Sequence, residues 1–317
     1  MMLHVIKSPA RAFDMIIDAE PWAVPYREAL RGRLNEPSGT PADDRGTPAI
    51  EGFEAARRRA SIARWDAGAD TWRRWTQRIG ALRARFQREV GAERLLAWLG
   101  FADFSDHCFA DAVDFGTLEL PAGVSFARAS FAGDAWFADL HFHGRADFQA
   151  ARFLSRASFE NGRFERNADF RHAVFLHDAR FTSICACQGM TFRDAEFSRD
   201  AWFRYSQFLG PLDLSKARIG GEAGFGNCLY AGDVDFSEAE FRDNGGFEQS
   251  IFSGKASFAR ASFGRHTRFT KSSFQKQPLF AGARFFAPCH FDDTSMPNIQ
   301  SPVAEQLKAL EQGLREA

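Results

Sequence analysis

The sequence lacks the features of a disulfide-rich secreted protein and of a membrane protein. Its five cysteines are odd in number and scattered, with no CxxC pair, which argues against a disulfide framework and against a zinc ribbon. No run of 18 apolar residues occurs, so no transmembrane helix is expected. The segment from Met1 to Pro9 lacks the basic and apolar stretches of a secretory signal. We therefore expect a cytoplasmic protein with reduced thiols.

A strong excess of charge of one sign is also missing. The 317 residues carry a formal net charge of −1, which gives the whole chain no electrostatic preference for nucleic acid or for basic partners. Tyrosine is scarce, with 3 residues against 35 phenylalanines. Since 45% of the residues are hydrophobic, the chain can bury a core. The excess of phenylalanine indicates what fills that core.

Phenylalanine recurs from Phe104 to Phe291 in steps that alternate between five and six residues. We call each position of this register a slot, and 30 of the 35 slots hold Phe. The other five slots hold Leu120, Ala186, Leu214, Ile219 and Tyr230. Such a register predicts a repeated structural unit. The predicted core includes Phe126, Phe131, Phe137, Phe142, Phe148, Phe153, Phe159, Phe164, Phe170, Phe203, Phe236, Phe258 and Phe263.

The residue two positions before a slot is usually small, and 17 of the 35 are Ala. Residues i and i−2 of an extended segment point to the same side, so each segment sends one ring and one small side chain inward. The polar residues between them, such as Asp147, Arg152 and Ser158, are expected to face water. An α-helix does not account for this pattern. At 3.6 residues per turn, residues that recur at steps of five and six do not stay on one face of a helix.

A five-residue extended side must turn a corner and stack on a neighbouring coil to satisfy its backbone groups, which predicts a solenoid. The motif stands as Ala146-Asp147-Phe148 and Ala168-Asp169-Phe170, and it resembles the pentapeptide-repeat family. The resemblance covers about 190 residues and implies a right-handed quadrilateral β-helix. Four sides of five, six, five and six residues sum to 22 residues per coil. We therefore expect an all-β solenoid of eight to nine coils over residues 101–295, with α-helical ends.

Opposite charges recur at the spacing of one such coil. Lys216, Glu238 and Arg260 form one column. Further pairs of opposite sign are Asp233/Lys255, Asp243/Arg265, Arg218/Glu240 and Arg156/Asp178. Because residues i and i+22 are stacked neighbours in a 22-residue coil, Glu238 is predicted to lie between its two basic partners on one outer face.

We expect an α-helical N-terminal cap region over residues 50–100, because apolar residues recur there at steps of three and four. Asp70 or Thr71 is expected to cap a second helix, and Gly91 and Gly100 are expected as helix C-terminal stops. The segment holds eleven Arg against six acidic residues, interleaved with four Trp. We interpret it as a solvated helix face that caps the solenoid, with nucleic-acid contact as the alternative.

The two outermost segments complete the predicted organisation. Residues 1–49 are expected to hold short helices, the first opening at Ser8-Pro9, and then a flexible linker over 35–49. Residues 296–317 are expected to form a helix with an apolar stripe of Val303, Leu307, Leu310 and Leu314. This helix either caps the last solenoid edge or forms a homodimer contact, as in topoisomerase-modulating members of the family that the sequence resembles.

Two side-chain groups are candidates for metal chemistry. His141 and His143 share an outward face, and the 22-residue stack places Glu119 beside His141 and Glu165 beside His143. We favour the interpretation that these are ordinary surface residues that do not bind a metal ion.

Cys185 and Cys187 flank the slot that has lost its ring and are expected to point outward. A local defect of the repeat is favoured there over a soft-metal or redox site.

No motif for catalysis or for a cofactor stands out. Gly220-Gly221 and Gly245-Gly246 lack the context of a phosphate loop and are expected at corners. No pattern of serine, histidine and carboxylate exceeds background. We therefore expect no enzymatic activity, no cofactor and no binding to membranes or nucleic acid.

Two function classes follow from these observations. The first is a non-catalytic protein-interaction module or scaffold with an unknown protein partner. The alternative is a DNA-mimicking modulator of a type II topoisomerase such as gyrase, a function implied only by the family resemblance. Residues 104–291 hold 22 acidic against 21 basic residues, and a DNA mimic needs a mostly negative surface. The charge balance therefore favours the interaction module.

Overall fold

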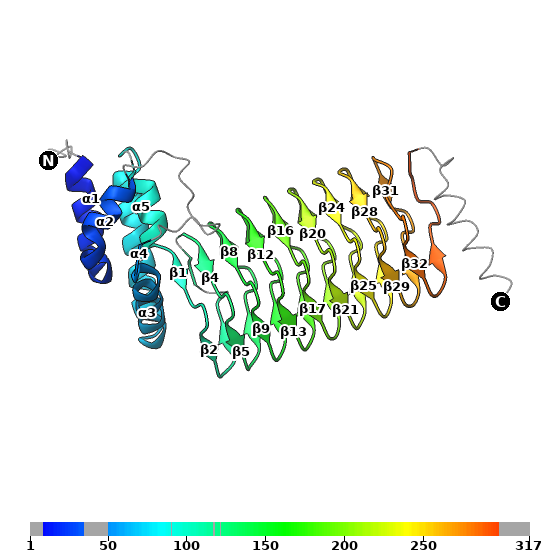
Figure 1. The fold of residues 1–317 in the computed structure, drawn as a ribbon, viewed down its shortest axis with the longest axis horizontal. Coiled ribbons are helices and arrows are strands. Elements are labelled where there is room, and N and C mark those ends of the chain that lie inside the picture. Colours follow the sequence, from blue (N-terminus) through cyan, green and yellow to red (C-terminus); the bar gives the residue numbers. More distant parts are fainter. Residues whose placement is uncertain (1–8, 35–49, 90, 117, 121, 298–317) are drawn as a thin grey trace. The chain divides into compact units, whose positions relative to one another are not determined.

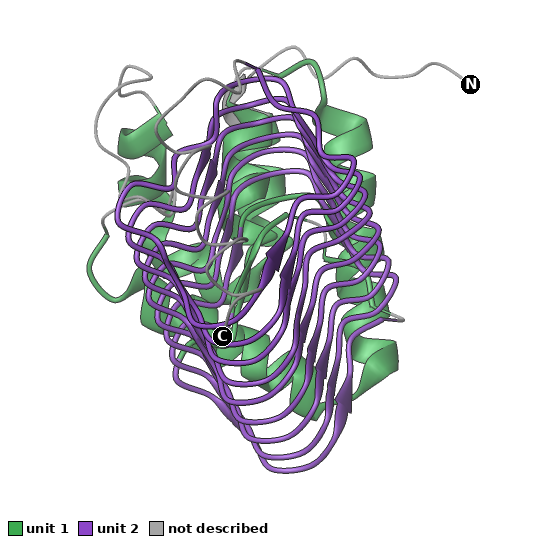
Figure 2. Ribbon diagram, turned by 90° about the vertical axis from the view of Figure 1, so that its right-hand side faces the viewer, with its two compact units in different colours: residues 1–105, 118–125, 142–145 green, residues 106–117, 126–141, 146–317 purple. Residues whose placement is uncertain are grey.

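The computed structural model describes residues 9–34, 50–89, 91–116, 118–120 and 122–297. The chain divides into two compact units, which are described in turn (Figures 1 and 2). Unit 1 comprises residues 1–105, 118–125 and 142–145, and unit 2 comprises residues 106–117, 126–141 and 146–317. The predicted linker over 35–49 and the candidate dimer contact at Val303, Leu307, Leu310 and Leu314 lie outside the described residues.

Unit 1 is mainly helical. Its helices are α1 (Pro9–Asp18), the 3-10 helix η1 (Pro21–Tyr26), α2 (Arg27–Leu34), α3 (Phe53–Asp66), α4 (Ala69–Phe86) and α5 (Ala92–Leu99). All six contribute to one apolar core, which includes Ile16 of α1, Leu30 of α2, Phe53 of α3 and Leu96 of α5. The segments before residue 35 and after residue 50 therefore share a single core. Among the described residues, none of the helices is both long and apolar enough to cross a membrane.

Two of the predicted helix ends are wrong. Gly68, not Asp70 or Thr71, is the N-cap of α4. Asp70 instead lies in the first helical turn, where a negative charge interacts favourably with the helix dipole. Gly91 is the N-cap of α5, with a φ of 81° in the left-handed region, and does not end the preceding helix. Gly100 is the C-cap of α5, as predicted.

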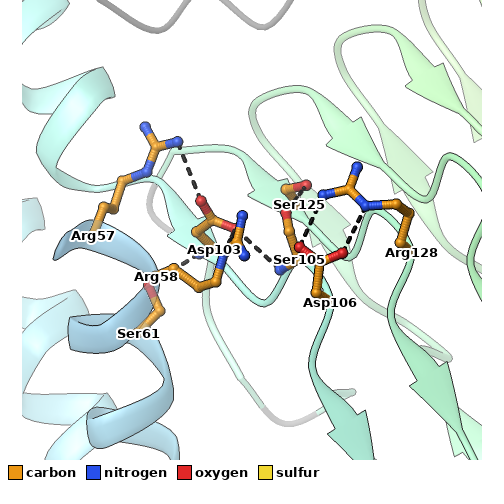
Figure 3. Close-up of polar contacts among 8 residues, drawn as sticks. All are labelled: Arg57, Arg58, Ser61, Asp103, Ser105, Asp106, Ser125 and Arg128. Carbon is orange, nitrogen blue, oxygen red and sulfur yellow. Dashed lines mark hydrogen bonds and ion pairs between the residues drawn. The ribbon is translucent and has the colours of Figure 1, made fainter. Parts of the chain in front are cut away.

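Helix α3 packs against the first strand of unit 1, β1 (Ala102–Asp103), which pairs in parallel with β4 (Val124–Ser125). Trp72 of α4 stacks on Phe104 with ring centroids 5.6 Å apart. The backbone N–H of Asp103 donates to Ser61 Oγ of α3 at 3.0 Å, and Arg57 Nη2 lies 3.4 Å from Asp103 Oδ2 (Figure 3). The helices thus satisfy a backbone group of a strand that would otherwise present an open edge.

Two-residue strands form a parallel β-solenoid, and most of these strands belong to unit 2. The β1 sheet has the order β1, β4, β8 (Ala146–Asp147), β12 (Ala168–Asp169), β16 (Met190–Thr191), β20 (Leu212–Asp213), β24 (Val234–Asp235) and β28 (Ala256–Ser257). The β2 sheet has the order β2 (Cys108–Phe109), β5 (Ser130–Phe131), β9 (Arg152–Phe153), β13 (Val174–Phe175), β17 (Glu196–Phe197), β21 (Arg218–Ile219), β25 (Glu240–Phe241), β29 (Ser262–Phe263) and β32 (Arg284–Phe285).

Two further sheets complete the four sides of each coil. The β3 sheet has the order β3 (Val113–Asp114), β6 (Ala135–Trp136), β10 (Ala157–Ser158), β14 (Ala179–Arg180), β18 (Ala201–Trp202), β22 (Ala223–Gly224), β26 (Gly245–Gly246), β30 (Thr267–Arg268) and β33 (Cys289–His290). The β7 sheet has the order β7 (His141–Phe142), β11 (Arg163–Phe164), β15 (Cys185–Ala186), β19 (Gln207–Phe208), β23 (Leu229–Tyr230), β27 (Ile251–Phe252) and β31 (Ser273–Phe274).

The strand register confirms the predicted fold class and the 22-residue coil. Ala157 pairs with Ala179 and Phe175 with Phe197, each 22 residues apart. The Phe rings stack along the solenoid, as for Phe131 and Phe153, whose centroids are 4.7 Å apart at 2°. This spacing is close to the distance between neighbouring strands. The thirteen Phe residues expected in the core are each at most 1% exposed.

The prediction that every polar residue beside a slot faces water is wrong for some positions. Asp147 is 1% exposed, and its Oδ1 accepts a hydrogen bond from the backbone N–H of Gln149 at 3.1 Å. Asp169 and Asp213 accept the same bond from the residue two positions on. Aspartate before a slot therefore satisfies the backbone of the following corner.

The corners use a backbone conformation that the sequence does not reveal. A non-glycine residue with positive φ recurs every eleven residues over long stretches, for example Ala150 at 55° and Asn161 at 58°. The N–H of Ala151 donates to Phe148 O at 3.0 Å, which closes a β-turn with a left-handed third residue. The predicted corner at Gly245-Gly246 is wrong, because these residues form β26.

Candidate interaction surface

In the β7 sheet, side chains alternate between the core and the surface. The slot residue of each strand points inward, and its two sequence neighbours point outward, as expected for extended backbone. In β19, Phe208 is buried, while Gln207 and Leu209 on either side of it are exposed. Outward residues of successive strands stack one above the other at the 22-residue spacing, so each column along the sheet can be read from the sequence.

Five successive strands of this sheet, β15, β19, β23, β27 and β31, carry no charged outward side chain. We call this surface the uncharged face. Its members are Cys185, Cys187, Gln207, Leu209, Leu229, Ala231, Ile251, Ser253, Ser273 and Gln275. In a chain with 26% charged residues, charge has been excluded from this surface, and depletion of charge distinguishes the centre of a protein interface from other surface.

The centre of the uncharged face is aliphatic. Leu229 pairs in register with Ile251, and Ala231 donates its backbone N–H to Phe208 O, beside Leu209. Leu209 is 44% exposed and Ile251 is 46% exposed. The Phe core beneath is already closed, because Phe208, Tyr230 and Phe252 are at most 1% exposed. The aliphatic side chains are therefore not needed to complete the core.

The β2 sheet of the same coils has the opposite character. Glu196 pairs in register with Arg218, and Arg218 with Glu240. We call these three residues the charged ladder. Arg218 Nε lies 3.7 Å from Glu240 Oε1, and these two side chains are 62% and 41% exposed. Such alternation places each charge beside one of opposite sign on the next strand, and exposed pairs of this kind give a modest gain in stability.

The predicted column of Lys216, Glu238 and Arg260 has the expected geometry. Arg260 Nη2 donates to Glu238 Oε1 at 2.5 Å. This hydrogen bond lowers the pKa of Glu238 below its ordinary value, and the positive charges of Arg260 and Lys216 act in the same direction.

One of the further predicted pairs, Arg156/Asp178, is stacked as expected but does not form an ion pair. In the described part of the chain, Arg156 pairs with Asp134 at 2.8 Å, one coil earlier, and not with Asp178. Both candidate partners satisfy the 22-residue spacing, so the spacing alone does not choose between them.

The predicted histidine group is partly assembled. His141 Nε2 lies 2.9 Å from Glu165 Oε1. His141, His143 and Glu165 each offer a ligand atom within 4.8 Å of the others, the one such group of three found among the described residues. Glu119, predicted beside His141, is not part of it. Arg163 Nε also approaches Glu165, at 3.8 Å, so a guanidinium competes for the carboxylate.

Cys185 and Cys187 lie close together on the uncharged face. Both are free thiols, both are half-buried, and their Sγ atoms are 3.8 Å apart. Burial raises the pKa of the Cys185 thiol above its ordinary value, Cys187 adds to this effect, and Arg163 opposes it. Cys228 and Cys289 are buried, in agreement with their inward positions in the repeat.

The sequence-based search for sites missed Leu209, Leu229 and Ile251, because it looked for residues that carry chemistry. The signal was present, since reading every outward position at the 22-residue spacing shows five successive strands without a charge. Patches of this kind become visible only after the coil length is known.

Comparison with known proteins supports the repeat assignment. A protein-family model described as pentapeptide repeats (9 copies) matches residues 140–184 and 192–240. No curated protein and no solved structure matches the chain.

Proposed function

This chain is a pentapeptide-repeat protein, and on that premise we propose that it is a non-catalytic interaction scaffold whose uncharged face binds a protein partner. The observation that carries the proposal is the run of five strands without an outward charge, with Leu209 and Ile251 exposed at its centre. An apolar, charge-depleted centre surrounded by polar residues is the composition of a protein-binding surface.

The solenoid backbone supports this function because it holds the face rigid. Each strand at the centre of the face is hydrogen-bonded to the strands on both sides, as β23 is to β19 and β27. A partner that docks there orders few additional residues of the scaffold, and a preorganised surface loses little conformational entropy on binding. Neighbouring side chains in a column lie about one strand spacing apart, roughly 4.8 Å, which suits a flat partner surface with small apolar side chains.

The DNA-mimic alternative is less well supported by the charges. A mimic of duplex DNA needs a continuous negative surface, whereas acidic side chains of unit 2 pair with basic ones one coil away. Examples are Asp106 with Arg128 and Glu238 with Arg260. We expect no inhibition of gyrase supercoiling by the purified chain, and inhibition at micromolar concentration would favour the alternative.

The experiment that tests the proposal compares two surfaces of one solenoid. Affinity capture with the full chain should retain a partner that the double variant Leu209→Asp/Ile251→Asp loses. The matched control, Arg218→Gln/Glu240→Gln on the charged ladder, should retain it. Loss of the partner from the control but not from the aspartate variant would contradict the proposal.

Light scattering of the purified chain adds a second readout. A chain that dimerises, and whose dimer dissociates in the Leu209→Asp/Ile251→Asp variant, would make a second copy the partner on the uncharged face. Deletion of residues 301–317 tests separately whether the C-terminal segment caps the solenoid or forms a dimer contact.

A further inference from the structure

The cysteine pair at one end of the uncharged face has a geometry that the interaction function does not use. We propose that Cys185 and Cys187 form a binding site for a single thiophilic metal ion of the Cu⁺ class. This site is distinct from the aliphatic centre of the face, and it does not depend on the proposed scaffold function.

The strand geometry places both sulfur atoms on one side. Cys185 and Cys187 flank Ala186, whose side chain is buried, so both neighbours point outward. The two Sγ atoms are 3.8 Å apart and are not bonded to each other. With a metal–sulfur bond of about 2.3 Å, sulfur atoms 3.8 Å apart are close enough to share one ion, and a change in side-chain torsion alone opens the pair to the near-linear geometry of a two-coordinate Cu⁺ ion. One ion can therefore bridge the thiolates without rearrangement of the backbone.

The strand that carries the two cysteines is packed and hydrogen-bonded on both sides, although its slot holds Ala186 and no aromatic ring. The residues at the usual small positions of this region are larger than Ala: Ile184 is 1% exposed and Met190 is 2% exposed. They add volume near the missing ring. Cys185 keeps both of its strand pairings, to Arg163 and to Gln207. The pair thus lies on a regular strand, and the loss of the ring has not produced an irregular loop.

Charge and ligand number favour a monovalent soft ion. When Cu⁺ binds, each thiol loses its proton to solvent, and the resulting bis-thiolate complex carries one net negative charge. Arg163 Nη1 lies 3.5 Å from Cys185 Sγ and can balance that charge. Among the described residues no third His, Cys, Asp or Glu joins the two thiols, whereas structural zinc sites have four ligands. Soft thiolates with low coordination select Cu⁺.

The test titrates the reduced full-length chain with Cu⁺ in competition with a chromogenic Cu⁺ chelator. We expect one ion per chain, and the variants Cys185→Ser and Cys187→Ser should each lose this binding while keeping the circular dichroism spectrum of the fold. Cys108→Ser is the matched control, because Cys108 is an exposed cysteine on β2 of the same unit, and it should bind as the unmodified chain does.

Two further measurements sharpen the assignment. Arg163→Gln should weaken Cu⁺ binding by about tenfold, the usual size of an effect from a residue beside the ligands, and Zn²⁺ should bind more weakly than Cu⁺. Unchanged Cu⁺ stoichiometry in the double variant Cys185→Ser/Cys187→Ser, loss of binding in Cys108→Ser, or a preference for Zn²⁺ over Cu⁺ would each overturn the proposal.

Discussion

The uncharged face and the charged ladder lie on two sides of the same coils and differ only in what points outward. Beneath both, the slot residues are buried to the same degree, as for Phe252 under the uncharged face and Phe197 under the ladder. Outside, one surface exposes Leu209 and Ile251, and the other exposes alternating charges. The core therefore fixes the backbone, and the outward columns are free to acquire function without a change of fold.

The largest expected effect tests whether the two sides have an equivalent core. Phe252→Ala and Phe197→Ala should each lower the free energy of unfolding by about 3–5 kcal/mol, because each removes a buried ring and leaves a cavity between stacked neighbours. Denaturant unfolding of the two variants measures this. A loss of less than about 1 kcal/mol on one side only would show that the core is not equivalent beneath the two faces.

A smaller loss of folding stability is expected at alkaline pH, from a thiol buried beneath the uncharged face. Burial raises the pKa of the Cys228 thiol from 9.0 to about 11 and raises the pKa of Tyr230 well above its ordinary value. The pKa of Cys228 is higher in the folded chain than in the unfolded chain. The contribution of this thiol to the free energy of unfolding is therefore complete below pH 9 and is lost as the pH rises towards 11. The loss should approach about 2–3 kcal/mol.

The measurement is the free energy of unfolding between pH 8 and pH 11, and Cys228→Ala provides the comparison. The variant is less stable at pH 8 but should show a flatter dependence on alkaline pH. An equal slope in the variant and the unmodified chain would contradict the assignment of the pH effect to this thiol.

The smallest effect concerns the charged ladder. Arg218→Gln should lower the free energy of unfolding by no more than about 1 kcal/mol, because the side chains of Arg218 and Glu240 are 62% and 41% exposed and solvent screens their ion pair. The difference should shrink further in 1 M salt. Thermal unfolding at low and high salt checks both statements, and a loss similar to that of Phe197→Ala would make the ladder part of the structural framework.

Most of the solenoid was predictable from the sequence, because each structural requirement repeats. A buried slot needs a large apolar side chain, so the alternating spacing of Phe gives the coil length, and the pairing of Ala157 with Ala179 confirms it. The corner at Gly220-Gly221 was predicted correctly, but most corners were not predictable. Positions with positive φ hold residues as different as Ala150 and Tyr205, because backbone hydrogen bonds between coils impose that conformation. Gly245-Gly246 has the composition of a corner but forms a strand.

The candidate site was predictable only in part, for a related reason. Outward positions have no shared requirement, so their residues carry no periodic signal, and the uncharged face is recognised only when columns are compared across coils. The outward direction of Cys185 and Cys187 followed from the repeat, but the 3.8 Å separation of their sulfur atoms depends on side-chain rotamers.

The central claim, that the uncharged face binds the partner, is tested most directly by calorimetric titration of the captured partner with two single variants. Ile251→Asp places a charge at the centre of the face and should weaken binding at least tenfold, or about 1.4 kcal/mol, while the free energy of unfolding changes by less than about 0.5 kcal/mol. Glu240→Gln on the ladder should bind as the unmodified chain does. Equal affinities of the Ile251→Asp variant and the unmodified chain would contradict the account.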